Sequence, residues 1–330
     1  MAAVLVHIGY QKTGSTWLQQ GLFSAREAGF GVVVRQSKVK RTMVAPDDFE
    51  FDAARCREAY QPRIDMMERR GVVPVISAER LSGRLGWTDD GARMAERLAR
   101  VVPEARVLVV LREQRSMLLS AYGQYIRMGG MLDLPRFLDR PVAWKEWPCD
   151  LRRYKYERLV GYYHKLFGRE RVLALTYEEL KADPAAFVRA VVDFGGAKPE
   201  PGALERLQVA ERVNESWPPA ALAAKRRANW LVRETRNPWA AVDARGWAGS
   251  AMNEAVRAFG SRVPRSTNER LALEMRSTVA VAVGDYYRES NARTSELTGL
   301  ELAKYGYDVE PDPRLPVAEV PVVTAAEAPS

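Results

Sequence analysis

The chain has 330 residues, of which 47% are hydrophobic and 28% charged, a composition typical of a globular protein with a sizeable core. Its two cysteines, Cys56 and Cys149, lack metal-type spacing and exclude a disulfide framework, so we expect buried packing residues in a cytoplasmic protein. The net charge of +8 is spread along the chain. This favours anionic ligands, while the concentrated basic stripe of a nucleic-acid-binding protein is missing.

The first apolar run covers residues 4–8, ends in a polar turn and has no basic flank. It therefore predicts a buried strand rather than a signal peptide. No segment reaches the roughly 18 consecutive apolar residues that a membrane-spanning helix needs. We expect no membrane span, and contact with a membrane surface stays open.

Apolar runs and amphipathic segments alternate through the first two thirds of the chain. Predicted strands cover 4–8, 72–77, 106–111 and 171–175, and predicted helices cover 15–28, 89–101, 113–127, 150–167 and 184–194. This alternation predicts the α/β class, with a central parallel sheet flanked by helices on both faces.

Strand signals end near Pro218. Residues 218–234, 251–260 and 267–303 have helical patterns, and we interpret 218–309 as a helical extension or cap of a single domain over 1–309. The composition from residue 310 is rich in Pro, Ala, Val and Glu, which predicts a disordered tail over 310–330.

The loop after the first strand, Gly9 to Trp17, reads Gly-Tyr-Gln-Lys-Thr-Gly-Ser-Thr-Trp. It joins a strand to a helix, at the edge of a parallel sheet where ligands bind. The helix N-terminus offers free backbone N–H groups, and Gly14 lets the backbone approach an anion closely. Lys12 adds a full charge, so the loop predicts an anion-binding site, with further hydroxyl donors from Thr13, Ser15 and Thr16.

The spacing of Gly9 and Gly14 matches the pattern G-x-x-x-x-G-K-[ST] of nucleoside triphosphatases. The lysine position of that pattern is Ser15 here, and the lysine comes earlier, at Lys12. Lys12 would meet the anion from the leading side of the loop, an arrangement for which we expect no metal. A small-molecule kinase, which would bind ATP with Mg²⁺, is the main alternative.

Residues 10–17 resemble the 5′-phosphosulfate-binding loop of sulfotransferases that use 3′-phosphoadenosine-5′-phosphosulfate (PAPS). The family pattern is Y-P-K-[ST]-G-[ST]-[ST]-W, and the one departure is Gln11 in place of proline. The resemblance implies a three-layer sandwich like that of P-loop NTPases, with PAPS as sulfonate donor and 3′-phosphoadenosine-5′-phosphate (PAP) as product. It implies that Lys12 stabilises the negative charge that develops on the leaving phosphate. The remaining cofactor-binding residues that it implies are Thr13, Gly14, Ser15, Thr16 and Trp17, the last of which either stacks on adenine or packs within its helix.

The family has a second signature, an arginine at the end of a later strand and a serine eight positions on. Here the strand over 106–111 is followed by Arg112, and Ser120 lies eight residues later in the next predicted helix. The resemblance implies that Arg112 and Ser120 bind the 3′-phosphate, for which a guanidinium fork is well suited.

Glu79 follows the strand over 72–77. In glycan sulfotransferases of the Golgi type, which this bacterial-type chain resembles more than the steroid and phenol type, a glutamate at this strand end is the general base. The resemblance therefore implies that Glu79 deprotonates the acceptor. The alternative is a salt bridge to Arg80 or a capping role. Steroid-type enzymes use a histidine, but His7 lies in the first strand and His164 late in a helix.

The sequence does not identify the acceptor, which is expected to be a small molecule or a glycan. Acceptor-contacting segments are expected in 36–62, 80–90, 128–150 and the helical C-terminal third. The cations and aromatic rings there that suit a glycan are Arg127, Arg136, Trp144, Lys145 and Trp147. A non-catalytic nucleotide- or glycan-binding protein is a further alternative, and the oligomeric state stays open.

Overall fold

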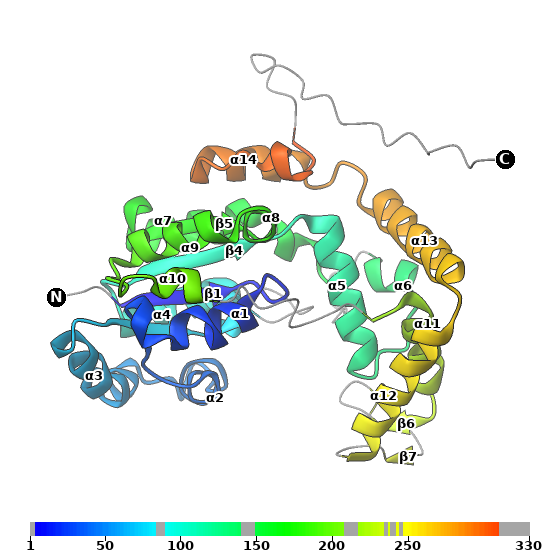
Figure 1. Ribbon diagram of the computed structural model, residues 1–330, viewed down its shortest axis with the longest axis horizontal. Helices are drawn as coiled ribbons and strands as arrows, with labels where there is room; N and C mark the ends of the chain where they lie inside the picture. Colours follow the sequence, from blue (N-terminus) through cyan, green and yellow to red (C-terminus); the bar gives the residue numbers. More distant parts are fainter. Residues whose placement is uncertain are drawn as a thin grey trace.

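The computed structural model describes residues 4–83, 90–139, 149–207, 217–233, 237, 242–243 and 247–309. Its centre is a five-stranded parallel sheet with the strand order β2-β3-β1-β4-β5 (Figure 1). The strands are β1 (Leu5–Gly9), β2 (Phe30–Val32), β3 (Val73–Ser77), β4 (Arg106–Leu111) and β5 (Val172–Thr176). The predicted α/β class with a parallel sheet is confirmed, and the short edge strand β2 is an addition to the four predicted strands.

Strands β1, β3, β4 and β5 contribute side chains to two cores, because successive residues of a strand point to opposite faces. On β1, Val6 and Ile8 belong to one core cluster and Leu5 to the other. On β4, Val109 and Val110 divide in the same way. Strands covered on both faces are apolar throughout, which is why a continuous run predicts them well.

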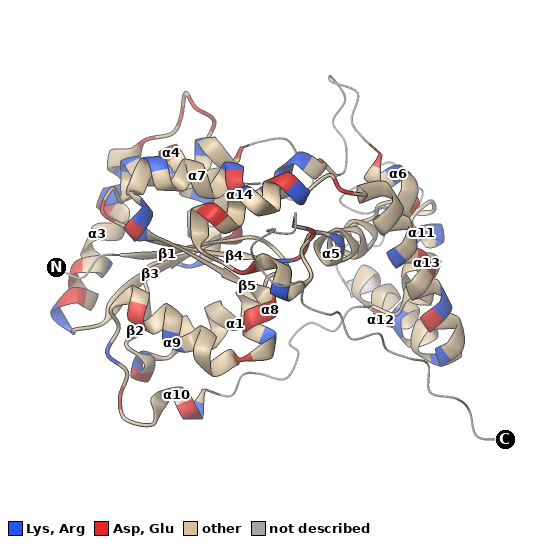
Figure 2. Cartoon of the chain, turned by 90° about the horizontal axis from the view of Figure 1, so that it is seen from above, with Lys and Arg blue, Asp and Glu red and all other residues tan. Residues whose placement is uncertain are grey.

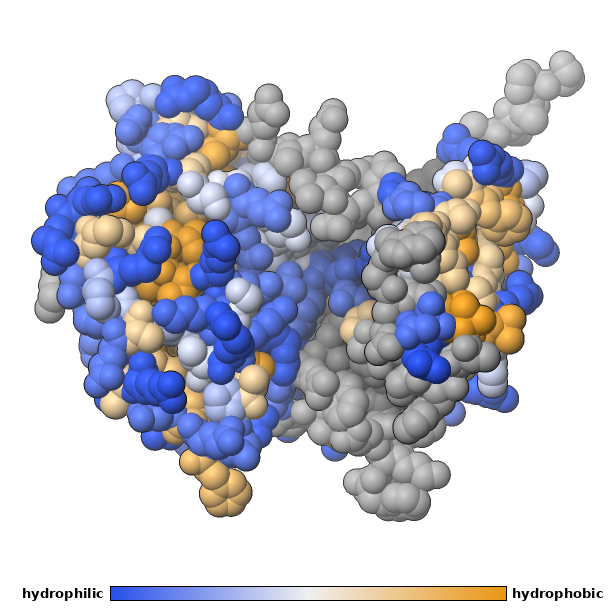
Figure 3. All heavy atoms as spheres, turned by 90° about the horizontal axis from the view of Figure 1, so that it is seen from below, coloured by the Kyte–Doolittle hydropathy of each residue, from blue (hydrophilic) through white to orange (hydrophobic). Residues whose placement is uncertain are grey.

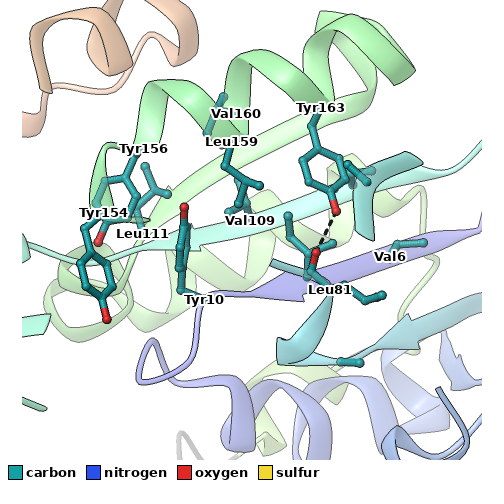
Figure 4. Packing of buried hydrophobic residues seen from close by; sticks show 14 of the residues in the cluster. Val6, Tyr10, Leu81, Val109, Leu111, Tyr154, Tyr156, Leu159, Val160 and Tyr163 are labelled. Atoms are coloured by element: carbon teal, nitrogen blue, oxygen red, sulfur yellow. Dashed lines mark hydrogen bonds between the residues drawn. The ribbon is translucent and has the colours of Figure 1, made fainter. Parts of the chain in front are cut away.

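Helices cover both faces of this sheet (Figure 2). Helices α3 (Ala53–Arg69), α4 (Gly91–Val101) and α7 (Tyr156–Phe167) contribute to the first core, and α1 (Ser15–Gln20), α8 (Tyr177–Ala182) and α9 (Pro184–Gly195) to the second. In the first core, Tyr10, Tyr156 and Tyr163 pack between the end of β1 and α7 (Figure 4). The shorter helices of this part are α2 (Gln36–Val39), α6 (Leu134–Leu138) and α10 (Ala203–Arg206).

Two predicted helices are shorter than the sequence pattern indicates. Helix α1 ends at Gln20, and the rest of 15–28 forms two 3₁₀ turns. At Gly21, a Cβ atom would lie 2.8 Å from the carbonyl oxygen of Trp17, so the chain turns there without a side chain. The predicted helix over 150–167 begins as a 3₁₀ turn, Leu151–Tyr154, and α7 begins at Tyr156.

Helix α3 was not predicted, although its sequence has a core stripe. Its buried residues include Cys56, Tyr60 and Ile64, which recur every four positions along one face. Pro62 lies inside the helix and obscures this pattern, because proline normally ends or kinks a helix.

The C-terminal region is an arm of helices beside the sheet, followed by a return to the sheet core (Figure 1). The arm contains α11 (Pro219–Ala228), α12 (Trp247–Arg262) and α13 (Arg265–Val283). Helices α11 and α13 pack against α5 (Gln114–Arg127), and α12 packs against α11. Helix α14 (Arg288–Thr298) then packs on α7, and its buried Asn291 bonds with Gln114 at the start of α5. The tail over 310–330 lies outside the described residues.

The expectation that strand signals end near Pro218 is wrong in detail. Two residues each of β6 (Val232–Arg233) and β7 (Val242–Asp243) pair as a small parallel sheet in the arm. A two-residue strand is too short for any sequence pattern to reveal. Within the described residues, no helix combines the length and the hydropathy that a membrane span needs.

The surface of the arm is more apolar than the surface over the sheet, as Figure 3 shows in part. Its exposed large hydrophobic residues include Trp230, Leu231, Val242, Phe259, Leu273 and Val281.

Candidate functional site

The loop after β1 has the backbone of an anion cradle. Lys12 and Gly14 both have positive φ, 69° and 82°, and the Thr13 hydroxyl donates to the carbonyl of Tyr10 at 2.6 Å. Gly14 lies against α8, where a Cβ atom would be 2.7 Å from Leu180 Cδ2. The positive φ favours glycine at this position, and a side chain there would also have to displace the end of Leu180.

Gln11, which stands where the family pattern has proline, anchors the loop to the segment after β3. The side chain is buried, and its Nε2 donates to the carbonyls of Glu79 and Gly83, each at 3.1 Å. Its Oε1 accepts from Arg153 at 3.1 Å, and the same guanidinium donates to the carbonyl of Gly83 at 2.9 Å. This network joins the anion loop to the turn that carries Glu79.

The role of Arg153 was not predicted. It lies 142 positions from Gln11, so no local pattern connects the two residues. In the structure Gln11 adds three hydrogen bonds, which hold Glu79 and the loop in register.

Lys12 and Glu79 follow the neighbouring strands β1 and β3 at their carboxyl ends, close enough for each charge to act on the other. Burial, with the nearby Arg127 and Arg112, lowers the pKa of Lys12 to about 8, while Glu79 acts in the opposite direction. Burial raises the pKa of Glu79, and the Ser15 hydroxyl, Lys12 and Lys40 oppose this rise. The pKa values of the two groups are therefore shifted toward each other.

The predicted alternative for Glu79, a salt bridge to Arg80, is wrong. Arg80 pairs with Asp90 instead, with 3.2 Å between NH2 and Oδ2. The N-cap of the 3₁₀ turn over Glu79–Ser82 is Ala78 rather than Glu79. The Glu79 carboxylate accepts a hydrogen bond from Ser15 and lies within reach of the Lys12 charge.

Arg112 follows β4 and lies beside the same loop. Its NH1 donates to the carbonyl of Lys12 at 2.9 Å, and its Nε donates to the Ser116 hydroxyl at 3.0 Å. The guanidinium also stands over the ring of Tyr177, 4.9 Å from its centroid. Ser120 lies one turn beyond Ser116 on α5, half-buried. The two predicted halves of the anion site are therefore adjacent and hydrogen-bonded to each other.

A polar pocket of about 350 Å³ opens next to Arg112. Three basic and two acidic side chains line the pocket, together with one serine, one tyrosine and one glycine. The lining residues are Arg112, Arg115, Lys181, Glu113, Glu178, Ser116, Tyr305 and Gly306. Glu178 accepts from the backbone N–H of Glu113 and from the Tyr307 hydroxyl, both at 3.2 Å. Residues 305–307, near the C-terminal end of the described chain, thus contact the pocket beside Arg112.

The tryptophan and the two histidines considered in the sequence analysis lie mainly in packed positions. Trp17 is 7% exposed and packs in the second core, which favours the helix-packing interpretation of this residue. His7 is buried in β1 with its Nδ1 2.8 Å from the Ser77 hydroxyl, and burial lowers its pKa to about 3. His164 lies half-buried on α7.

Arg127 is the predicted acceptor-side cation that the structure brings closest to Lys12, since its charge lowers the pKa of Lys12. Arg136 is exposed on α6. Trp144, Lys145 and Trp147 lie outside the described residues. Over the described ranges, no three or more His, Cys, Asp and Glu side chains gather as a metal ion would require.

Comparisons with known proteins agree on one family. A model of the sulfotransferase domain matches residues 4–214. Similar solved structures include a sulfotransferase from Alicyclobacillus acidocaldarius, 18% identical with a TM-score of 0.46 over 70% of this chain and 93% of that one. Mouse sulfotransferase SULT7A1 complexed with PAP is 13% identical, with a TM-score of 0.39 over 83% and 90% of the two chains. A sulfotransferase domain from the curacin biosynthetic pathway is 12% identical, with a TM-score of 0.39 over 83% and 98%. Curated proteins give no match.

Proposed function

The chain belongs to the sulfotransferase family, whose members are PAPS-dependent enzymes, and we propose that it transfers sulfonate to a hydroxyl or amine of a carbohydrate or glycoconjugate. The observation that carries this proposal is the proximity of the Lys12 and Glu79 charges, beside Arg112, at the carboxyl ends of β1, β3 and β4. Sulfonate transfer requires a cation for the leaving group and a base for the acceptor, and a carboxylate can serve as that base.

The donor fits the cradle because its charges match the cations around it. PAPS carries its sulfonate on the 5′-phosphate, which leaves when the acceptor attacks the sulfur atom. Lys12 is the cation for the leaving phosphate, with Thr13, Gly14, Ser15, Thr16 and Trp17 around it, and Arg112 with Ser120 holds the 3′-phosphate. Donors fixed in advance toward developing charge give the largest catalytic contribution in many enzymes.

Glu79 is the proposed base that takes the proton of the attacking hydroxyl or amine. Its raised pKa makes it a better proton acceptor than an exposed glutamate, while Lys12 and Ser15 keep part of the charged form. The histidines are poor candidates, because His7 is enclosed in β1 and bonded to Ser77.

We also propose that residues 1–309 act as one domain, with 218–309 as a cap. The bonds between Asn291 and Gln114, and the packing of α14 on α7, support this assignment because they tie the C-terminal region to the sheet core. The free, buried Cys56 and Cys149 are consistent with a cytoplasmic location.

The test is a calorimetric titration of PAP into metal-free protein, with ATP as comparator, followed by transfer of label from ³⁵S-PAPS to a mixed glycan pool. We expect PAP to bind without Mg²⁺ and more tightly than ATP, and the label to move to glycan. ATP binding that depends on Mg²⁺ would overturn the proposal and favour the kinase. PAP binding without transfer to any acceptor would favour the non-catalytic alternative.

A further inference from the structure

Arg127, the last residue of α5, is a half-buried cation without a counter-ion in the described part of the chain. Burial lowers its pKa. Its contact there is with the ring of Trp217, whose centroid lies 5.9 Å from the guanidinium carbon. A guanidinium withdrawn from water with no carboxylate beside it carries an uncompensated desolvation cost.

The surroundings of Arg127 increase this cost. Arg127 and Arg112 both act on Lys12 and lower its pKa, while Glu79 acts on it in the opposite direction. Two cations, Arg127 and Arg112, thus act on a third, Lys12, and the carboxylate that opposes them among the described residues is the half-buried Glu79. Such a region gains most from a ligand with negative charge.

The position of Arg127 separates it from the proposed 3′-phosphate contacts. Ser120 and Arg127 are seven residues apart on α5, so they share a face and lie about 10 Å apart along the axis. Trp217 lies two residues before α11 of the arm. Arg127 thus lies at the arm end of α5, whereas Arg112 lies at the sheet end (Figure 1).

We propose that Arg127, against Trp217, binds an acidic group of the acceptor, so the acceptor is an acidic carbohydrate with a carboxylate near the hydroxyl or amine that is modified. This inference rests on the proposed sulfonate transfer and specifies its acceptor. The guanidinium fork matches a carboxylate in two parallel hydrogen bonds, and the indole ring suits the apolar face of a sugar. Arg127 is then a specificity-determining residue that orients the acceptor between Lys12 and Glu79.

The test uses two sugars that differ by one carboxylate, methyl β-D-glucuronide and methyl β-D-glucoside, titrated into the full chain saturated with PAP. We expect wild type to bind the glucuronide about 10- to 100-fold more tightly, the range of one charge-assisted interaction. Arg127→Gln should remove this preference, and Arg127→Lys should keep part of it. The matched control Arg276→Gln, an exposed arginine of α13, should keep all of it.

The outcomes separate the two proposals. Failure of PAP to bind wild type would overturn the proposed function itself. PAP binding without a glucuronide preference, or with a preference that survives in Arg127→Gln, would overturn only the inference. Weaker binding of PAPS but not of PAP to Arg127→Gln would also overturn it, because Arg127 would then hold the transferred sulfonate.

Discussion

The two ends of α5 carry arginines in opposite situations. Arg112, just before the helix, bonds to the Lys12 carbonyl and to Ser116 and stands over Tyr177. Arg127, at the other end, has the ring of Trp217 as its described contact. Hydrogen bonds within the protein hold Arg112 in place, whereas no carboxylate pairs with Arg127 among the residues that the structure describes.

This difference corresponds to the two substrates of the proposed reaction. The donor is the same for every member of the family, so its contacts can be built into a rigid sheet edge. The acceptor differs between members, and we propose that its contacts come from the end of α5 and the start of the arm. The predictions below test this division, beginning with the largest effect.

Lys12→Ala should reduce turnover by at least ~10²-fold, the scale of losing one preorganised donor to developing charge. The measurement is the rate of PAP release from PAPS in the presence of the glycan pool. Lys198→Ala, which lies outside the site, is the control. Turnover near the wild-type rate in Lys12→Ala would remove Lys12 from the chemistry.

Gln11→Ala should lower the free energy of unfolding by about 1–3 kcal/mol, because it leaves buried carbonyls and Arg153 without partners. Turnover should fall together with stability, since the turn that carries Glu79 loses its link to the loop. Urea unfolding measures the first effect, and the exposed Gln61→Ala is the control. Unchanged stability would show that Arg153 alone holds the turn.

The ionisation of Lys12 should respond to the arm end of α5. The free amine fraction of Lys12 rises with pH through its pKa of about 8, and Arg127 contributes to that lowered value. Arg127→Gln should therefore raise the pKa and shift the loss of the ammonium to higher pH. The rate of Lys12 acylation against pH, followed by mass spectrometry, measures this shift. The same pKa in both proteins would place Arg127 too far from Lys12 to act on it.

Tyr307→Phe should have the smallest effect, a loss of about 1 kcal/mol of unfolding free energy for one hydrogen bond. It removes the donor to Glu178 at the pocket near Arg112. Tyr305→Phe, on the half-exposed neighbour, is the control for urea unfolding. A similar loss in both variants would assign the effect to packing rather than to the hydrogen bond.

The sequence predicted the parts of the site that are local in the chain. The strand over 4–8, the loop with Lys12 and the pair of Arg112 and β4 all lie within short stretches with a fixed spacing. The contacts that hold these stretches together were not predictable, because Arg153 reaches Gln11 from 142 positions away and Arg112 reaches Lys12 from 100. Helix α3 was missed because Pro62 obscures its stripe, and β6 and β7 because two residues have no periodicity.

The most direct test of the division along α5 is the affinity of the metal-free protein for PAP, measured by calorimetry in Arg112→Ala and in Arg127→Gln. The account predicts that Arg112→Ala weakens PAP binding by roughly 10- to 100-fold, the worth of one charge-assisted contact, and that Arg127→Gln leaves it unchanged. Equal losses in the two variants, or no loss in Arg112→Ala, would contradict it.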